Sequence, residues 1–256
     1  TVAVSFQTAD QDQYMGINDT LSMHAASTMK VPVMMEVFRQ VQAGKFSLSD
    51  SIVIKNEFKS IIDGSLYSMD ITEDGGDRLY AMIGKKESIR SLVHEMITYS
   101  GNLATNLLIG WVQPENVQNL MKQIGANDIQ VLRGVEDIKA FEAGKSNTTT
   151  AKDLAIIYQD IYNGSEWTES SRKEMIDILL DQKFNKKIPA GLPKEVKVAH
   201  KTGSITEIDH DSGIIYPPQT APYILVVLTK GFKEHERAQE TIAEISRRIY
   251  AWYMGL

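Results

Sequence analysis

Ser27 and Lys30 stand three residues apart where a helical pattern begins. Residues at this spacing lie on one face of a helix, one turn apart. A neutral lysine amine can accept the proton of a serine hydroxyl and so activate it as a nucleophile. The free N–H groups at a helix start favour the negative charge that then develops. The plain alternative is that Ser27 only caps the helix, since serine is a common N-cap residue.

A second polar group, Ser100-Gly101-Asn102, falls between two expected helices. The Ser100 hydroxyl can pass a proton to a leaving nitrogen. The Asn102 amide can hold both a substrate carbonyl and the lysine. Serine, glycine and asparagine are also ordinary turn residues, so the group taken alone fits a helix–helix turn.

A third group, Lys201-Thr202-Gly203-Ser204, lies on an expected strand near the C-terminus. Lys201 and Thr202 can bind a substrate carboxylate, because a cation and a hydroxyl both donate hydrogen bonds to it. Gly203 lets a ligand backbone approach closely. The N–H of Ser204 can join that of Ser27 to form an oxyanion hole. A strand that ends in a turn is the structural alternative.

Hydrophobic periodicity indicates which elements carry these three groups. Strands alternate apolar and polar residues, whereas helices repeat their apolar residues every three to four positions. The expected strands are residues 1–7, 11–15, 196–204, 212–216 and 223–229. The expected helices are residues 27–43, 88–96, 103–112, 114–124, 150–162, 170–180 and 238–252.

Strands at both chain ends and helices in the middle predict one α+β domain over residues 1–256, an α/β/α sandwich. Residues 1–26 and 188–256 are expected to form one antiparallel sheet backed by the last helix. Residues 27–187 are expected to form an inserted helical subdomain, in which residues 48–80 give no clear pattern. A ligand site between the two subdomains is the natural expectation.

Composition excludes several classes of protein. With 27 Lys and Arg against 33 Asp and Glu, the net charge is −6 and no basic cluster occurs, which argues against a nucleic-acid partner. No apolar run reaches the roughly 20 residues that span a bilayer. Without cysteine, disulfides, thiolate metal sites and cysteine nucleophiles are ruled out. The histidines show no metal-ligand spacing, so we expect neither a metal nor a cofactor.

The order Ser-x-x-Lys, Ser-x-Asn, Lys-Thr-Gly resembles the signature set of class A β-lactamases and penicillin-binding proteins. The likeness extends over almost the whole chain. Arg133-Gly134-Val135-Glu136 looks like the start of the Ω-loop of class A enzymes, and residues 147–150 look like its end. Residues 211–218 resemble the family's strand after Lys-Thr-Gly.

The resemblance implies a serine hydrolase that opens β-lactams through an acyl-enzyme. By this resemblance Ser27 is the nucleophile, Lys30 and Glu136 are bases, and Ser100 relays a proton. The implied substrate-binding residues are Asn102, Lys201, Thr202, Gly203 and Ser204. The implied partner is a β-lactam or a peptidoglycan-like small molecule. We also expect a monomer and, from the resemblance, a periplasmic or secreted location.

Four departures from the family pattern concern deacylation. Gly101 replaces the usual aspartate of the second motif, and one extra residue separates Arg133 from Glu136. Ala140 replaces an asparagine that helps hold the hydrolytic water, and Asn147 replaces the aspartate that pairs with the loop arginine. We therefore predict sound acylation and slow deacylation. The arginine that the family usually adds near the third motif is not found between residues 202 and 212.

Two alternatives stay open. One is a penicillin-binding D-Ala-D-Ala peptidase or esterase with a long-lived acyl-enzyme, and the other is a non-catalytic penicillin-binding sensor. Glu136 favours the β-lactamase, because peptidases of this superfamily lack that residue. Asp137 and Glu142 of the same loop are expected to be solvated. His210 and Asp211 are expected in a turn beside the pocket.

Overall fold

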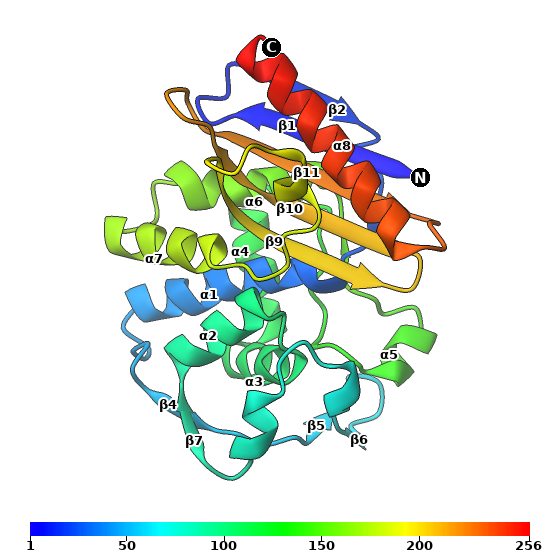
Figure 1. Cartoon of the computed structure of the whole chain (residues 1–256). Coiled ribbons are helices and arrows are strands. Elements are labelled where there is room, and N and C mark those ends of the chain that lie inside the picture. Colours follow the sequence, from blue (N-terminus) through cyan, green and yellow to red (C-terminus); the bar gives the residue numbers. More distant parts are fainter.

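Strands from both ends of the chain form one antiparallel sheet of five strands (Figure 1). The computed structural model describes residues 1–256. The sheet consists of β1 (Val2–Thr8), β2 (Tyr14–Ile17), β9 (Lys197–Ile205), β10 (Ile208–Tyr216) and β11 (Tyr223–Lys230). Their order is β2-β1-β11-β10-β9, so β9, which carries the third motif, is an edge strand.

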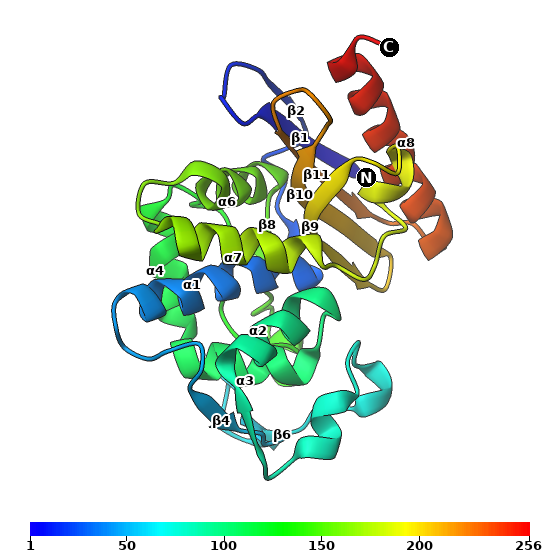
Figure 2. The same ribbon diagram turned by 60° about the vertical axis from the view of Figure 1, so that its left-hand side comes forward.

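Apolar residues cover both faces of the sheet. Every residue of β11 except Lys230 is buried, as expected for a strand packed on two sides. Helix α8 (His235–Met254) packs Ile242 and Ile249 against Phe6 and Leu225 on one face. In Figure 2 the sheet lies between α8 and the helices α6 (Ala151–Asn163) and α7 (Glu169–Leu180).

The helical part surrounds one central helix. Residues 30–38 of α1 (Lys30–Gln42) are all buried, so this helix is covered on every side. Around it lie α2 (Ile89–Thr98), α3 (Asn102–Val112) and α4 (Pro114–Gln123). Helix α5 (Ile138–Glu142) follows α4 along the chain. Short 3₁₀ helices are η1 (Ala26–Met29), η2 (Ile71–Glu73), η3 (Arg78–Met82) and η4 (Ile188–Gly191). Three two-stranded pairs are β3 (Met23–His24) with β8 (Thr148–Thr149), β4 (Ser51–Val53) with β7 (Lys86–Ser88), and β5 (Phe58–Lys59) with β6 (Leu66–Tyr67).

The predicted fold class is confirmed, and several element bounds are corrected. The strand expected at residues 11–15 is β2, which begins at Tyr14 because the hairpin turn occupies the preceding residues. The first helix opens as the 3₁₀ helix η1 and becomes α-helical only at Lys30. Strand β10 begins at Ile208 rather than at residue 212.

His210 and Asp211 therefore lie inside a strand, and the expectation that they form a turn was wrong. Both are buried, since β10 pairs with β9 on one side and β11 on the other. Asp211 Oδ1 lies 2.8 Å from His200 Nδ1, and His210 Nε2 lies 2.9 Å from the backbone oxygen of His24. Polar residues fit inside this strand because neighbouring elements satisfy their hydrogen bonds.

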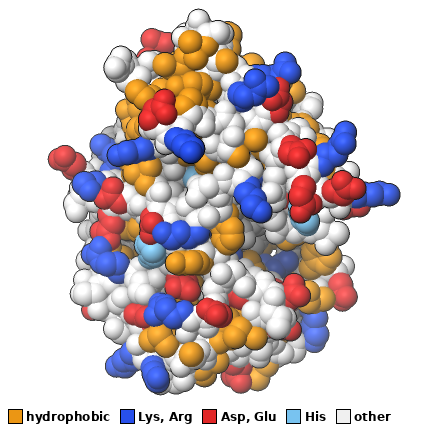
Figure 3. All heavy atoms as spheres, viewed as in Figure 1, with side chains coloured by type: hydrophobic (Ala, Val, Ile, Leu, Met, Phe, Trp, Pro, Cys, Tyr) orange, Lys and Arg blue, Asp and Glu red, His pale blue; other side chains and the backbone are white.

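Charges of both signs are mixed over the face shown in Figure 3. That face has no continuous basic surface of the kind that binds a phosphate backbone. None of the helices is long and apolar enough to cross a membrane.

Candidate active site

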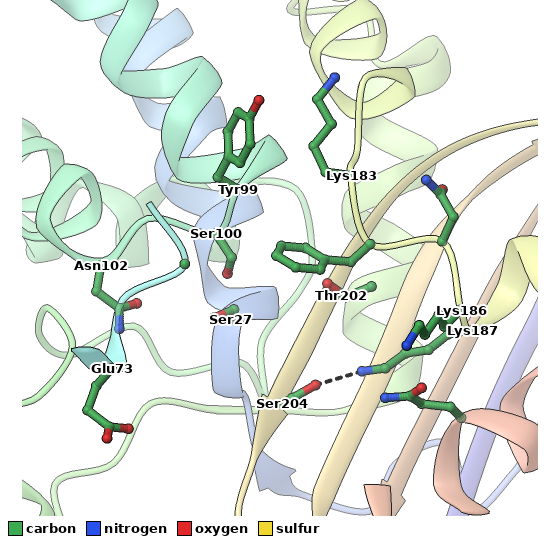
Figure 4. Close-up of a pocket in the computed structure, with 14 residues that line it drawn as sticks. Ser27, Glu73, Tyr99, Ser100, Asn102, Lys183, Lys186, Lys187, Thr202 and Ser204 are labelled. Atoms are coloured by element: carbon green, nitrogen blue, oxygen red, sulfur yellow. Dashed lines mark hydrogen bonds between the residues drawn. The ribbon is translucent and has the colours of Figure 1, made fainter. Parts of the chain in front are cut away.

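The three sequence motifs meet at one cavity of about 330 Å³ beside the edge strand β9. Figure 4 shows Ser27, Ser100 and Asn102 reaching it from the helical part, and Thr202 and Ser204 reaching it from β9. The remaining wall comes from residues 183–187, Glu73, Gly75, Tyr99 and Gln239. Only two of the 14 lining residues are hydrophobic, so the cavity suits a polar ligand.

Ser27 lies in η1, directly after a residue with a left-handed backbone. Ala26 has φ 46°, a conformation that residues other than glycine rarely adopt. Neither η1 nor α1 has a side-chain cap, so Ser27 is not an N-cap. Its hydroxyl is left free to face the cavity, where it can react.

Gly203 is where β9 touches the Ser27 backbone. A Cβ atom at Gly203 would lie 3.1 Å from Ser27 N and 3.3 Å from Thr28 N. The missing side chain thus makes room for protein backbone, and the approach of a ligand to Gly203 stays a prediction. This close approach brings the backbone of β9 next to that of η1.

Lys30 is buried beneath the cavity and donates three hydrogen bonds. Its Nζ lies 2.6 Å from the backbone oxygen of Ser100, 3.2 Å from Ser100 Oγ and 2.8 Å from Asn102 Oδ1. Burial lowers its pKa to about 7, although the charges of Asp74 and Glu136 act in the opposite direction. No hydrogen bond joins Lys30 Nζ to Ser27 Oγ.

The Ser100 hydroxyl sits between two lysine amines. It accepts from Lys30 Nζ at 3.2 Å and from Lys201 Nζ at 3.0 Å. A hydroxyl has two lone pairs and one proton, so the proton of Ser100 is free for a third partner. Ser100 also has a left-handed backbone, with φ 59°.

Lys201 lies under the cavity wall and is fully buried. Burial and the nearby charges of Lys30 and Lys187 hold its pKa well below the usual value. Its Nζ donates to Ser100 Oγ and to the backbone oxygen of Thr202. The structure thus places Thr202 on the wall and the Lys201 amine behind it.

Asn102 connects Lys30 to Glu136. Its Oδ1 accepts from Lys30 Nζ at 2.8 Å, and its Nδ2 donates to Glu136 Oε1 at 2.7 Å. Burial raises the pKa of the Glu136 carboxyl, against the effect of the Asn102 hydrogen bond. Glu136 also has φ 61°, and it lies behind Asn102 rather than on the cavity wall.

The loop that carries Glu136 is tied down by Asp137. This carboxylate accepts from Ser60 Oγ at 2.8 Å, Ile61 N at 2.9 Å and Ala140 N at 3.1 Å. The expectation that Asp137 is solvated was therefore wrong, because it caps α5 and binds a neighbouring loop. Glu142 is exposed, as predicted. Ala140 is buried and offers no side-chain group to a water molecule.

Arg133 and Asn147 hold the two ends of this loop together without a charged pair. Asn147 Nδ2 donates to the Arg133 backbone oxygen at 2.9 Å, and Asn147 Oδ1 accepts from Leu132 N at 2.8 Å. The Arg133 guanidinium donates to the backbone oxygens of Lys145 and Gly134. Hydrogen bonds to the backbone thus close the loop.

Two residues of the site were not predicted from the sequence. Lys187 is buried, and its Nζ donates to Ser204 Oγ at 2.8 Å (Figure 4). The same Nζ lies 2.9 Å from Asp209 Oδ1. Asp74 accepts from Asn102 N at 2.6 Å. Neither lies in a motif, and Asp74 comes from the stretch without a clear pattern. No group of three or more His, Asp or Glu side chains is arranged to hold a metal ion.

A family model described as "Beta-lactamase enzyme family" matches residues 1–253. A beta-lactamase of Bacillus amyloliquefaciens is 30% identical over 165 residues, which are 62% of this chain and 54% of that relative. The chain thus spans about half the length of that relative. The structure of PBP-A is 24% identical, with a TM-score of 0.85 over 100% of this chain and 91% of that one. A beta-lactamase structure from Sphaerobacter thermophilus is 24% identical, with a TM-score of 0.85 over 100% and 92%. Both solved structures share this fold.

Proposed function

This chain belongs to the beta-lactamase enzyme family, and from that premise we propose that it is a class A-like serine hydrolase. It opens the β-lactam ring through an acyl-enzyme on Ser27, and it needs no cofactor. The observation that carries the proposal is the buried hydrogen-bond network beside Ser27. In that network Lys30 binds both Ser100 and Asn102, and Asn102 binds Glu136.

Acylation starts with removal of the Ser27 proton. With a pKa of about 7, close to half of the Lys30 amine is neutral at neutral pH and can accept it. The Ser27 oxygen then bonds to the lactam carbonyl carbon, and the N–H groups of Ser27 and Ser204 stabilise the oxyanion. The proposal is supported by the close approach of β9 to η1 at Gly203.

Breaking the lactam C–N bond requires a proton on the departing nitrogen. Ser100 supplies it, because its oxygen already accepts from Lys30 and Lys201 and its own proton is free. The lysine amine that took the Ser27 proton then restores the Ser100 proton. Protons and charge balance over this cycle without any outside group.

The substrate carboxylate binds between Thr202 and Ser204. Both line the cavity, and the Lys201 amine lies behind them. Lys187, which is paired with Asp209, also reaches this wall through its hydrogen bond to Ser204 Oγ. Lys187 thus lies near this wall, and the sequence has no arginine between residues 202 and 212.

Deacylation depends on Glu136, which activates a water molecule for attack on the ester. Its raised pKa suits a general base. Ala140 gives that water no polar partner, and Glu136 lies off the cavity wall, so we propose slow turnover limited by deacylation. The same two observations favour the second candidate, a penicillin-binding peptidase or esterase whose acyl-enzyme persists. A periplasmic or secreted location belongs to either proposal.

The test combines nitrocefin hydrolysis with mass spectrometry of the intact protein. We expect a penicillin adduct on a peptide containing Ser27, and slow but measurable steady-state hydrolysis of nitrocefin. Ser27→Ala should lose the adduct and keep the fold, because the Ser27 side chain makes no capping hydrogen bond. An adduct that is never hydrolysed would instead support the penicillin-binding peptidase or esterase. A protein that forms no adduct would be a non-catalytic relative, and both proposals would be wrong.

A further inference from the structure

Helix α3 begins at Asn102 without a side-chain cap of its own. Its N-cap residue is Gly101, which has no side chain to accept a hydrogen bond. The first N–H groups of a helix need partners from outside the helix. Here a carboxylate from another loop accepts them, since Asp74 Oδ1 lies 2.6 Å from Asn102 N and Asp74 Oδ2 lies 2.9 Å from Leu103 N.

The Asp74 carboxylate is itself held in place. Tyr80 donates its hydroxyl to Asp74 Oδ2 at 2.8 Å, and Gly76 N lies 3.2 Å from Asp74 Oδ1. The next residue, Gly75, packs so closely that a Cβ atom there would lie 2.0 Å from the backbone oxygen of Tyr99. The loop that carries Asp74 therefore contacts the turn that carries Ser100.

We propose that Asp74 is a positioning residue for acylation of Ser27. It fixes the first turn of α3 from outside the helix, and it thereby fixes the Asn102 side chain between Lys30 and Glu136. A carboxylate at a helix N-terminus also interacts favourably with the helix dipole. The role rests on the proposed function, because it matters only if Lys30 and Asn102 serve that reaction.

The charge of Asp74 also acts on Lys30 and Glu136. It raises the pKa of Lys30 against the effect of burial, and it also raises the pKa of Glu136. The groups that face the Lys30 amine are Asp74, Glu136 and the Lys201 amine. Removal of the Asp74 charge therefore lowers the pKa of Lys30. A helix cap without an electrostatic role would leave that pKa unchanged.

The experiment compares Asp74→Asn with the full-length parent protein in single-turnover acylation by penicillin G. The asparagine keeps the shape but replaces one accepting oxygen with an amide nitrogen, and it removes the charge. We expect the acylation rate constant to fall at least ten-fold at its plateau. We also expect its acidic limb to move to lower pH, because Lys30 then stays neutral at lower pH.

Thr168→Ala is the matched control, because Thr168 caps α7 through Ser171 N and does not line the cavity. It should lose stability and acylate at the parent rate. If Asp74→Asn does not fold, Gly101→Asp is added to it, since an N-cap aspartate can accept from the first turn of the helix.

Four outcomes separate the proposal from its alternatives. A folded Asp74→Asn that acylates at the parent rate, with an unmoved acidic limb, would overturn the role of Asp74. A folded double variant that remains ten-fold slower than the parent would overturn it as well, whereas recovery to within about three-fold would support it. A parent protein that forms no Ser27 adduct would instead refute the proposed function, which keeps the two failures distinct.

Discussion

Lowering the pH from 7 to 5 should slow the acylation of Ser27 about fifty-fold. The pKa of Lys30 is about 7, so about half of its amine is neutral at pH 7. At pH 5 only about 1% is neutral, since each pH unit below the pKa reduces that fraction about ten-fold. If neutral Lys30 accepts the Ser27 proton, the acylation rate constant follows this fraction.

The assay is single-turnover acylation at saturating penicillin G, followed by intact mass between pH 5 and pH 8. Saturation separates the chemical step from substrate binding, which Lys201 also influences. Far-UV circular dichroism at pH 5 verifies that the protein remains folded. Lys30→Ala should acylate very slowly, and its residual rate should not depend on pH over this interval.

Glu136 is the competing base, and its variant separates the two assignments. Glu136→Gln keeps an oxygen that can accept from Asn102 Nδ2, so Asn102 and Lys30 should keep their positions. The acidic limb should persist in this variant and move to lower pH, because the charge of Glu136 raises the pKa of Lys30. If the limb disappears in Glu136→Gln, the reasoning about Lys30 is wrong and the acylating base is Glu136.

Three further predictions follow from the contacts of single residues. Glu136→Gln should slow deacylation about 10²–10⁴-fold, so that nitrocefin gives a burst without a steady state; unchanged turnover would contradict this. Lys201→Ala should lower kcat/KM for penicillin G several-fold, because it removes the hydrogen bond that Lys201 Nζ donates to Ser100 Oγ, and such a bond contributes about 0.5–1.5 kcal/mol. Lys194→Ala, which removes an exposed lysine, serves as its control, and an equal loss in both variants would argue against a specific role. Asp137→Ala should lower the free energy of unfolding in urea by about 1–3 kcal/mol, since it leaves Ser60 Oγ and two backbone N–H groups without their acceptor. Stability equal to that of the parent would show that water replaces these bonds.

The sequence predicted the site residues whose positions follow from the order of helices and strands along the chain. Ser27 and Lys30 lie at the start of a buried helix, Ser100 follows another helix, and Lys201 lies on a strand. Periodicity locates such elements, and the order of the motifs along the chain indicates that they meet. The structure brings Ser100 Oγ within 3.2 Å of both lysine amines.

The parts that could not be predicted depend on contacts between distant segments. Asp74 caps a helix that begins 28 residues later, and capping across such a separation leaves no local pattern. The contact of Gly203 with the Ser27 backbone was not predicted, because the sequence does not show which atoms approach a missing side chain. Asp137 was taken as solvated, because its partners Ser60 and Ile61 lie 77 and 76 residues away. Lys187 lies outside the three motifs, so the sequence gives no signal for its contact with Ser204.

The left-handed backbone at Ala26, Ser100 and Glu136 bears on how this protein can evolve. A residue other than glycine in this conformation costs of the order of 1–3 kcal/mol, and a whole domain is stable by only about 5–15 kcal/mol. Glycine at any of the three positions would relieve that cost. At positions 100 and 136 it would also remove a side chain of the hydrogen-bond network. A library screened for heat resistance alone should therefore accumulate glycine at these positions and lose activity. Selection for thermostability and selection for catalysis would then favour different residues at the same positions.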